Sequence, residues 1–265
     1  MINAFPYLIL PVCHTYATTG DYEVKVGLLD NLTMLDLNNT KVKTFRGGNA
    51  SDLRQLILNS NEISSLPEGV FSELSALEEL LLRDNPLNTI LSGTFDSLSS
   101  LHNLDLGGTH LSSLPEEIFS ELTSLQSLRL NGNNLSTLPE SIKGLSALFW
   151  LILENNQLTT LPDDLFSGLT SLSTLRLNDN HLSMLPENFS GLTALQHLSL
   201  SGNQFSTLPI DIFNGMTSLT HLSVANNFLH DLPTIPASAS LSADYNCIGS
   251  RDASPATIAT LTSKV

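Results

Sequence analysis

The segment LHNLDLGGTHLSSLPEEIFSELTS, residues 101–124, contains the pattern that decides the fold of this 265-residue chain. Its first part fits L-x-x-L-x-L-x-x-N-x-L, with Thr109 in place of the asparagine, and it continues as L-P-x-x-x-F-x-x-L. The pattern recurs with a period of 24 residues, and a degenerate last copy ends at Ile248. The clear copies start at Leu32, Leu53, Leu77, Leu101, Leu125, Leu148, Leu172, Leu195 and Leu219. So many matches to a constrained pattern predict a protein built from about ten stacked repeats.

The leucines of each copy predict one β-strand per repeat. In Leu104-Asp105-Leu106 the alternation has the period of a strand, so the leucines point inward and the residue between them points outward. Parallel strands need a crossover connection, which the P-x-x-x-F-x-x-L segment supplies as a short irregular or single-turn helical arm. Because strands are narrower side by side than these arms, we expect the stack to curve with the sheet on its concave face. The predicted fold class is an α/β solenoid.

Two further columns of residues, one of asparagine and one of phenylalanine, have structural roles in the repeat. A buried amide at the turn after each strand can satisfy backbone groups that the sheet does not reach. These positions are Asn61, Asn85, Asn133, Asn156, Asn180, Asn203 and Asn227, with Thr40 and Thr109 as substitutes. An aromatic column predicts an apolar spine under the convex arms. It comprises Phe71, Phe95, Phe119, Phe166, Phe189 and Phe213, with Ile142 in one copy. The copies starting at Leu125 and Leu172 have 23 residues, which we expect only to flatten the convex surface locally.

Over residues 32–248 this pattern resembles the typical, 24-residue subclass of the leucine-rich repeat family. The resemblance implies a curved horseshoe. Because members of this subclass are mostly extracellular, it also implies a secreted or cell-surface protein. The string HTYATTGDYEVKV, residues 14–26, resembles the last-strand signature of extracellular bacterial β-sandwich modules of the polycystic-kidney-disease type. That second resemblance indicates a bacterial source.

Both ends depart from the repeat, and a solenoid needs caps over its apolar ends. Residues 1–31 are predicted to form a β-hairpin cap whose second strand pairs with the first repeat. Residues 249–265 are predicted to form a C-terminal cap, incomplete if the chain is truncated here, with a short helix starting at Ser254. Cys13 and Cys247 lie near opposite ends of the stack, too far apart for a mutual disulfide. Cys247 is then either a buried free thiol or the half of a disulfide whose partner a truncation has removed.

Composition excludes several classes of function. The net charge is −15, so the chain repels nucleic-acid phosphates and anionic lipid. It contains no run of about 18 apolar residues that would cross a bilayer, and we assign no signal peptide to residues 1–13. No H-E-x-x-H, G-x-S-x-G, Walker or C-x-x-C motif occurs, so we expect no enzyme, metal site or cofactor. His197 and His221 occupy equivalent places on adjacent strands, but without a third ligand we predict two solvated histidines.

The concave face is the surface that the fold leaves free for function. Trp150, the only tryptophan, lies there beside Ile152 and near Phe149, with Arg129 and Arg176 on the flanking strands. Exposed aromatics with neighbouring arginines are the composition of binding hot spots. The alternative is that Trp150 folds down and covers gaps between its neighbours. A smaller outward group comprises Ile57, Leu81, Glu79, Arg83 and Asp84.

These residues predict a monomeric, non-enzymatic recognition or adhesion module that binds a protein ligand on its concave face, with a surface glycan as the alternative ligand. A second hypothesis is a structural spacer or display domain of a longer surface protein, which a concave face without a competent patch would favour. A third is an effector delivered into host cells. It fits poorly, because bacterial effectors of this kind use shorter repeats.

Overall fold

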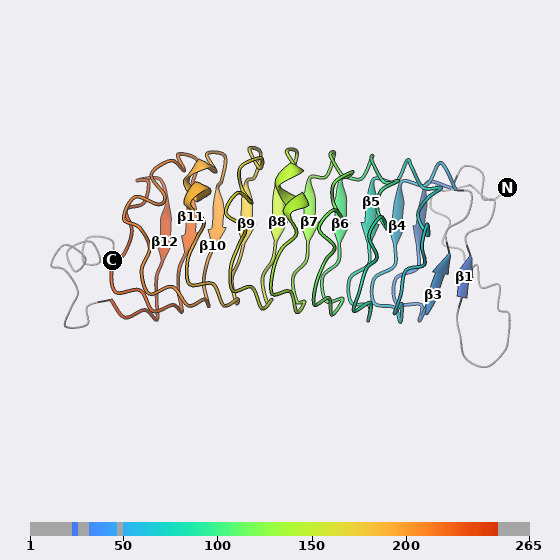
Figure 1. Cartoon of the computed structure of the whole chain (residues 1–265), viewed down its shortest axis with the longest axis horizontal. Helices are drawn as coiled ribbons and strands as arrows, with labels where there is room; N and C mark the ends of the chain where they lie inside the picture. The colour runs from blue at the N-terminus through green and yellow to red at the C-terminus, as the bar shows by residue number, and fades with distance from the viewer. Residues whose placement is uncertain (1–22, 26–31, 47–49, 249–265) are drawn as a thin grey trace, which may run out of the picture.

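The computed structural model describes residues 23–25, 32–46 and 50–248, in which the chain forms an elongated stack of coils (Figure 1). Each repeat contributes one short strand to a ten-stranded parallel sheet in which chain order is preserved. Its strands are β2 (Met34–Asp36), β4 (Gln55–Ile57), β5 (Glu79–Leu81), β6 (Asn103–Asp105), β7 (Ser127–Arg129), β8 (Trp150–Ile152), β9 (Thr174–Arg176), β10 (His197–Ser199), β11 (His221–Ser223) and β12 (Ser240–Ser242). The predicted solenoid with a parallel sheet is confirmed.

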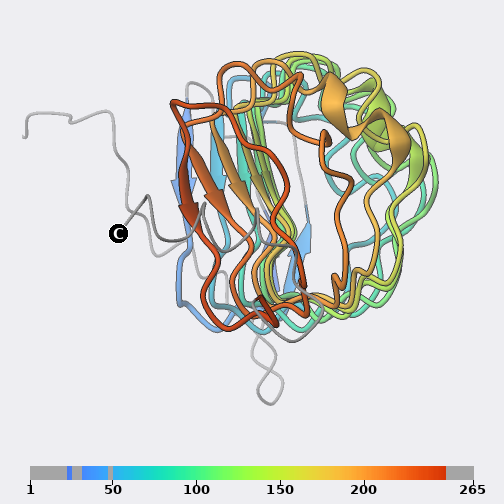
Figure 2. The same cartoon turned by 90° about the vertical axis from the view of Figure 1, so that its left-hand side faces the viewer.

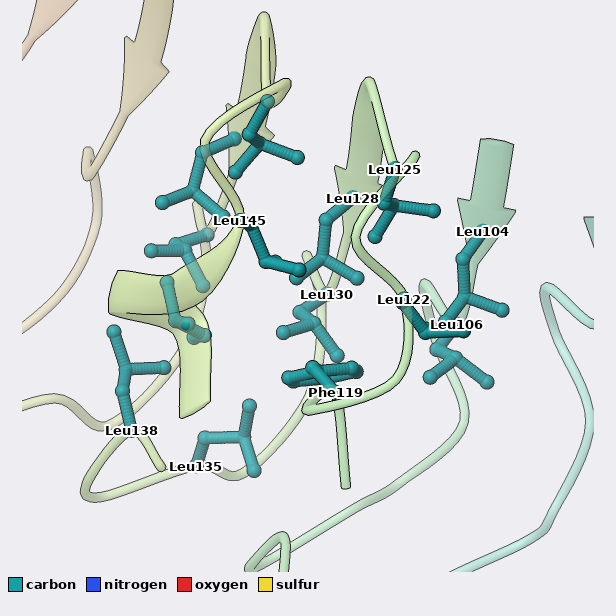
Figure 3. Packing of buried hydrophobic residues seen from close by; sticks show 14 of the residues in the cluster. Leu104, Leu106, Phe119, Leu122, Leu125, Leu128, Leu130, Leu135, Leu138 and Leu145 are labelled. Atoms are coloured by element: carbon teal, nitrogen blue, oxygen red, sulfur yellow. The ribbon is translucent and has the colours of Figure 1, made fainter. Parts of the chain in front are cut away.

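The register of the sheet follows the leucine pattern without a slip. Leu104 of β6 pairs with Leu128 of β7, which pairs with Leu151 of β8, and all three are fully buried. Figure 3 shows how Leu104 and Leu128 pack with Leu106 and Leu130, which directly follow β6 and β7, and with Phe119 from the arm. The first and third residues of each strand therefore share the opposite face, which we call the concave face.

The convex arms are mostly turns, and they lie across the coil from the sheet (Figure 2). Only η1 (Glu140–Gly144) and η2 (Glu187–Gly191) among the described arms form 3-10 helices. These two helices fall in the two 23-residue repeats. The missing residue thus does more than flatten the surface, because it tightens the arm into a helical turn.

The repeat that follows each 3-10 helix carries a glycine at the position of Glu73, Ser97 and Glu121, and the two 23-residue repeats also have glycine there, as Gly144 and Gly191. A Cβ atom on Gly168 would lie 2.0 Å from the carbonyl oxygen of Lys143 in η1. A Cβ atom on Gly215 would lie 2.4 Å from the carbonyl oxygen of Ser190 in η2. Each helix therefore approaches the next arm so closely that only glycine fits there.

The asparagine column forms the predicted ladder between repeats. The Asn133 side-chain oxygen accepts hydrogen bonds from the Thr109 and Leu111 backbone N–H groups of the preceding repeat, at 3.1 and 2.9 Å. Its amide nitrogen donates to the carbonyls of Leu106 and Leu130, at 2.8 and 2.9 Å. Thr109 substitutes only in part, because its hydroxyl reaches the carbonyl of Leu106 in its own turn.

The residue just before each ladder position adopts a left-handed backbone. Glycine or asparagine serves in several repeats, for example Gly132 at φ 67° and Asn155 at φ 57°. Ser60 and Tyr245 occupy the same position with φ of 54° and 57°. A bulky side chain is strained in this conformation.

The aromatic spine is confirmed and extends one repeat further than predicted. Phe71 and Phe95 stack with ring centroids 6.2 Å apart, and Phe45 of β3 (Thr44–Arg46) lies 6.2 Å from Phe71. The strand β1 (Glu23–Lys25) pairs with β3 in a separate two-stranded parallel sheet. The remaining residues of the predicted N-terminal hairpin and the predicted helix at Ser254 lie outside the described residues, as does Cys13.

Candidate functional site

The sheet places Trp150 and three of the four residues predicted around it on adjacent strands of the concave face. In register, Ser127, Trp150 and Thr174 form one row, and Arg129, Ile152 and Arg176 form the next. Phe149 precedes β8, and its ring contacts that of Trp150 edge to face, with centroids 4.6 Å apart. We call Arg129, Phe149, Trp150, Ile152 and Arg176 the Trp150 patch.

The Trp150 patch is accessible to a partner. Trp150 keeps 43% of its surface exposed and Phe149 keeps 38%, although packing alone would favour burying both rings. Arg176 lies 3.4 Å from the carboxylate of Glu154, whereas Arg129 forms no salt bridge with any described residue. The patch therefore combines two aromatic rings, a half-buried isoleucine and one uncommitted guanidinium.

The second predicted group lies on β4 and β5 of the same face. Ile57 and Leu81 are register partners and both are half-buried. Glu79 accepts a hydrogen bond from Asn103, and Arg83 pairs with Asp84 at 3.3 Å. Only β6 lies between β5 and β7, so the two groups border a single surface.

Sequence reasoning missed a cluster of polar side chains on β6 and β7, between the two predicted groups. It consists of Asn103, Asp105 and Ser127, which we call the β6–β7 polar cluster. Asp105 is 7% exposed and Ser127 is 5% exposed, although both occupy outward positions. The Ser127 hydroxyl oxygen and the Asn103 side-chain oxygen are buried without a hydrogen-bond partner in the described part of the chain. Each such orphan costs about 1–3 kcal/mol.

The electrostatics of this cluster centre on Asp105. Burial raises the pKa of its carboxyl above the ordinary value. A hydrogen bond from the Gly107 backbone N–H, at 2.9 Å, and attraction to Arg129 and Arg83 lower the pKa by less. The sequence signal was an aspartate at an outward position two residues after Asn103, but the strand period alone does not predict that it is buried.

A groove of about 610 Å³ runs over β9 to β12, and the sequence did not predict it. Small side chains at the third strand position hollow the face here, namely Ser199, Ser223 and Ser242. His197 and His221 line it, with ring centroids 4.7 Å apart and an interplanar angle of 25°. In the described ranges no group of three or more histidine, cysteine, aspartate or glutamate residues could hold a metal ion.

Two other sequence expectations concern the surroundings of the site. No helix in the described part of the chain is long and apolar enough to span a membrane. Cys247 is half-buried and forms no disulfide within the described part of the chain.

Comparison with known proteins agrees with the geometry. A leucine-rich repeat family model matches residues 51–111, 99–158 and 150–205, and a two-copy leucine-rich repeat model matches residues 193–237. No curated protein sequence gives a significant match.

Three crystal structures illustrate the likeness in fold. An internalin from Listeria monocytogenes has 25% identity and a TM-score of 0.65, over 79% of this chain and 62% of its own. An internalin C2 from the same species has 26% identity and a TM-score of 0.63, over 74% of this chain and 82% of its own. The leucine-rich repeat ectodomain of a plant membrane receptor kinase from Arabidopsis thaliana, in complex with Casparian strip integrity factor 2, has 27% identity and a TM-score of 0.65. This chain, matched over 83% of its length, spans 28% of that ectodomain.

Proposed function

The chain belongs to the leucine-rich repeat family, and from this premise we propose that it is a non-enzymatic recognition module that binds a protein partner through the Trp150 patch. The observation that carries the proposal is the exposure of Trp150 on the concave face and of Phe149, whose ring contacts it. A folded protein gains by burying such rings, and tryptophan and arginine are the residues most enriched in binding hot spots. The plant ectodomain with the same fold was crystallised in complex with Casparian strip integrity factor 2, which supports a macromolecular ligand for this fold.

The proposal includes the place where this partner is met. Members of the 24-residue subclass are mostly extracellular, and two of the similar structures come from Listeria. We therefore place the binding event outside a bacterial cell, on its surface or after secretion. Protease digestion of intact source cells, followed by detection with an antibody to this chain, tests the location.

The first test reads the state of Trp150 alone, because the chain contains one tryptophan. We expect red-shifted emission from the native protein and ready quenching by acrylamide and iodide. Blue-shifted emission that resists both quenchers would mean that the ring is covered, and the patch would lose its anchor.

The second test measures what Trp150 contributes to binding. A displayed protein library is selected on the wild-type chain, and the selected binders are then measured against Trp150→Ala. We expect affinity to fall about 30-fold or more, the equivalent of the ~2 kcal/mol that defines a hot spot. Phe228→Ala is the matched control, because this ring is 55% exposed but follows the asparagine turn instead of a concave strand. Binders that tolerate Trp150→Ala would contradict the proposed site, and selection of glycans alone from a parallel array would contradict a protein partner.

A further inference from the structure

The β6–β7 polar cluster has hydrogen-bonding needs that the described chain does not meet. Asn103 and Ser127 are register partners on adjacent strands, and Asp105 shares their face two residues along β6. Ser127 is in turn the register partner of Trp150. The cluster therefore adjoins the Trp150 patch on one continuous surface.

The orientation of the Asn103 amide is fixed by its neighbour. Its nitrogen lies 2.6 Å from a carboxylate oxygen of Glu79, and a carboxylate can only accept. The Asn103 oxygen must then point away from Glu79, and it is buried there without a donor. The Ser127 hydroxyl oxygen beside it is also without a partner.

Every member of the cluster carries an oxygen that can accept a hydrogen bond, and the two orphan oxygens are buried in this structure. Asp105 uses one carboxylate oxygen for the Gly107 N–H, and Glu79 adds a second carboxylate. Arg83 is engaged with Asp84, and Arg129 attracts Asp105 without reaching salt-bridge distance. Two carboxylates and two orphan oxygens thus share two cationic neighbours, Arg129 and Arg83, and neither guanidinium forms a salt bridge with Asp105 in the described part of the chain, so acceptors remain for a further donor.

We infer that the β6–β7 polar cluster receives an arginine side chain of the protein bound at the concave face. The inference rests on the proposed function, since it names the chemistry of the partner at the same surface. A guanidinium offers five N–H donors in a plane, which suits several acceptors spread over two strands. The exposed Trp150 ring next to Ser127 provides a face on which a cation can stack. A net charge of −15 on the chain favours a basic partner as well.

The experiment compares two capped peptides that differ in one group. N-acetyl-Gly-Arg-Phe-Gly-amide is titrated against its citrulline analogue, which keeps the shape of arginine but has no charge. Binding is followed by Trp150 fluorescence and by calorimetry. We expect the arginine peptide to bind about tenfold or more tightly, as a charge-assisted hydrogen bond to a buried carboxylate would give.

Variants locate the effect within the cluster. Asp105→Asn should remove the preference for arginine over citrulline, and Ser127→Ala should weaken arginine binding severalfold. Asp36→Asn is the matched control, because Asp36 occupies the same strand position on β2 but is exposed and remote. Its affinity for both peptides should equal that of the wild type.

The outcomes separate this inference from the proposed function. Equal affinity of the two peptides, or an Asp105→Asn variant that still prefers arginine, overturns the inference. An ordered water that satisfies the two orphan oxygens would give that result. If either peptide then still loses affinity in Trp150→Ala, the proposed function stands without the arginine site. If neither peptide binds, the inference fails, and the library selection alone decides the proposed function.

Discussion

Replacing Asn133 by alanine should destabilise the stack far more than any surface change nearby. The Asn133 side chain is 4% exposed and takes part in four hydrogen bonds to backbone groups of two repeats. Both carbonyls that it serves have a second donor. The Thr109 hydroxyl reaches Leu106, and the next ladder residue, Asn156, reaches Leu130 at 2.9 Å.

The Thr109 and Leu111 backbone N–H groups decide how much unfolding free energy Asn133→Ala loses. Thr109 and Leu111 are fully buried, and their N–H groups have no other acceptor in the described chain. Two buried donors at about 1–3 kcal/mol each predict that Asn133→Ala loses at least about 2 kcal/mol of unfolding free energy.

Urea unfolding followed by far-ultraviolet circular dichroism and by Trp150 fluorescence measures the loss. Asn134→Ala is the matched control, because Asn134 is exposed and makes a single long contact of 3.5 Å with the carbonyl of His110. It should stay within about 0.5 kcal/mol of the wild type. Equal effects of the two substitutions would refute the reasoning that orphaned amides set the stability of the turn.

Three further predictions follow from the arms, the turns and the polar cluster. Gly168→Ala should lower the free energy of unfolding by about 1–3 kcal/mol, because its Cβ atom would meet the Lys143 carbonyl oxygen. Gly144→Ala has open space around the new Cβ atom and should change the free energy of unfolding little or raise it by about 0.5 kcal/mol in the same urea assay. Tyr245→Gly should raise the unfolding free energy by about 1 kcal/mol by relieving its positive φ, and an unchanged midpoint would contradict the strain. Asp105 has a folded-state pKa above its unfolded value, so its stabilising contribution is complete below pH 3.8 and is lost as pH rises through the folded pKa. The Asp105→Asn variant should therefore have a higher melting temperature than the wild type at neutral pH and the same melting temperature in acid.

The fold could be predicted from the sequence because its determinants are local and repeated. The alternation of Leu104 and Leu106, the ladder position of Asn133 and the arm position of Phe119 each follow from one repeat of 24 residues, and stacking multiplies them. Phe45 escaped prediction because it belongs to the shorter first copy, where the arm pattern is missing.

The candidate site was only half predictable, because it depends on contacts between repeats. The outward positions of Trp150 and Arg129 follow from the strand period, and the structure places them side by side. The burial of Asp105 and Ser127 does not follow from that period, which predicts outward and exposed positions for both residues. The groove likewise depends on side-chain volume, since β10 and β11 carry Ser199 and Ser223 at the position where β9 carries Arg176.

The pairing of each short repeat with a glycine in its successor sets the smallest unit by which this protein can be rearranged. A 23-residue copy moved elsewhere in the stack would press its helical carbonyl against Glu73, Ser97 or Glu121. The copy that had followed it would keep its glycine, Gly168 or Gly215, although no helical carbonyl would then lie against it. Gene duplication or laboratory shuffling should therefore move each 23-residue copy only together with the copy that follows it, as a unit of about 47 residues, whereas the 24-residue copies without a 3-10 helix carry no such constraint.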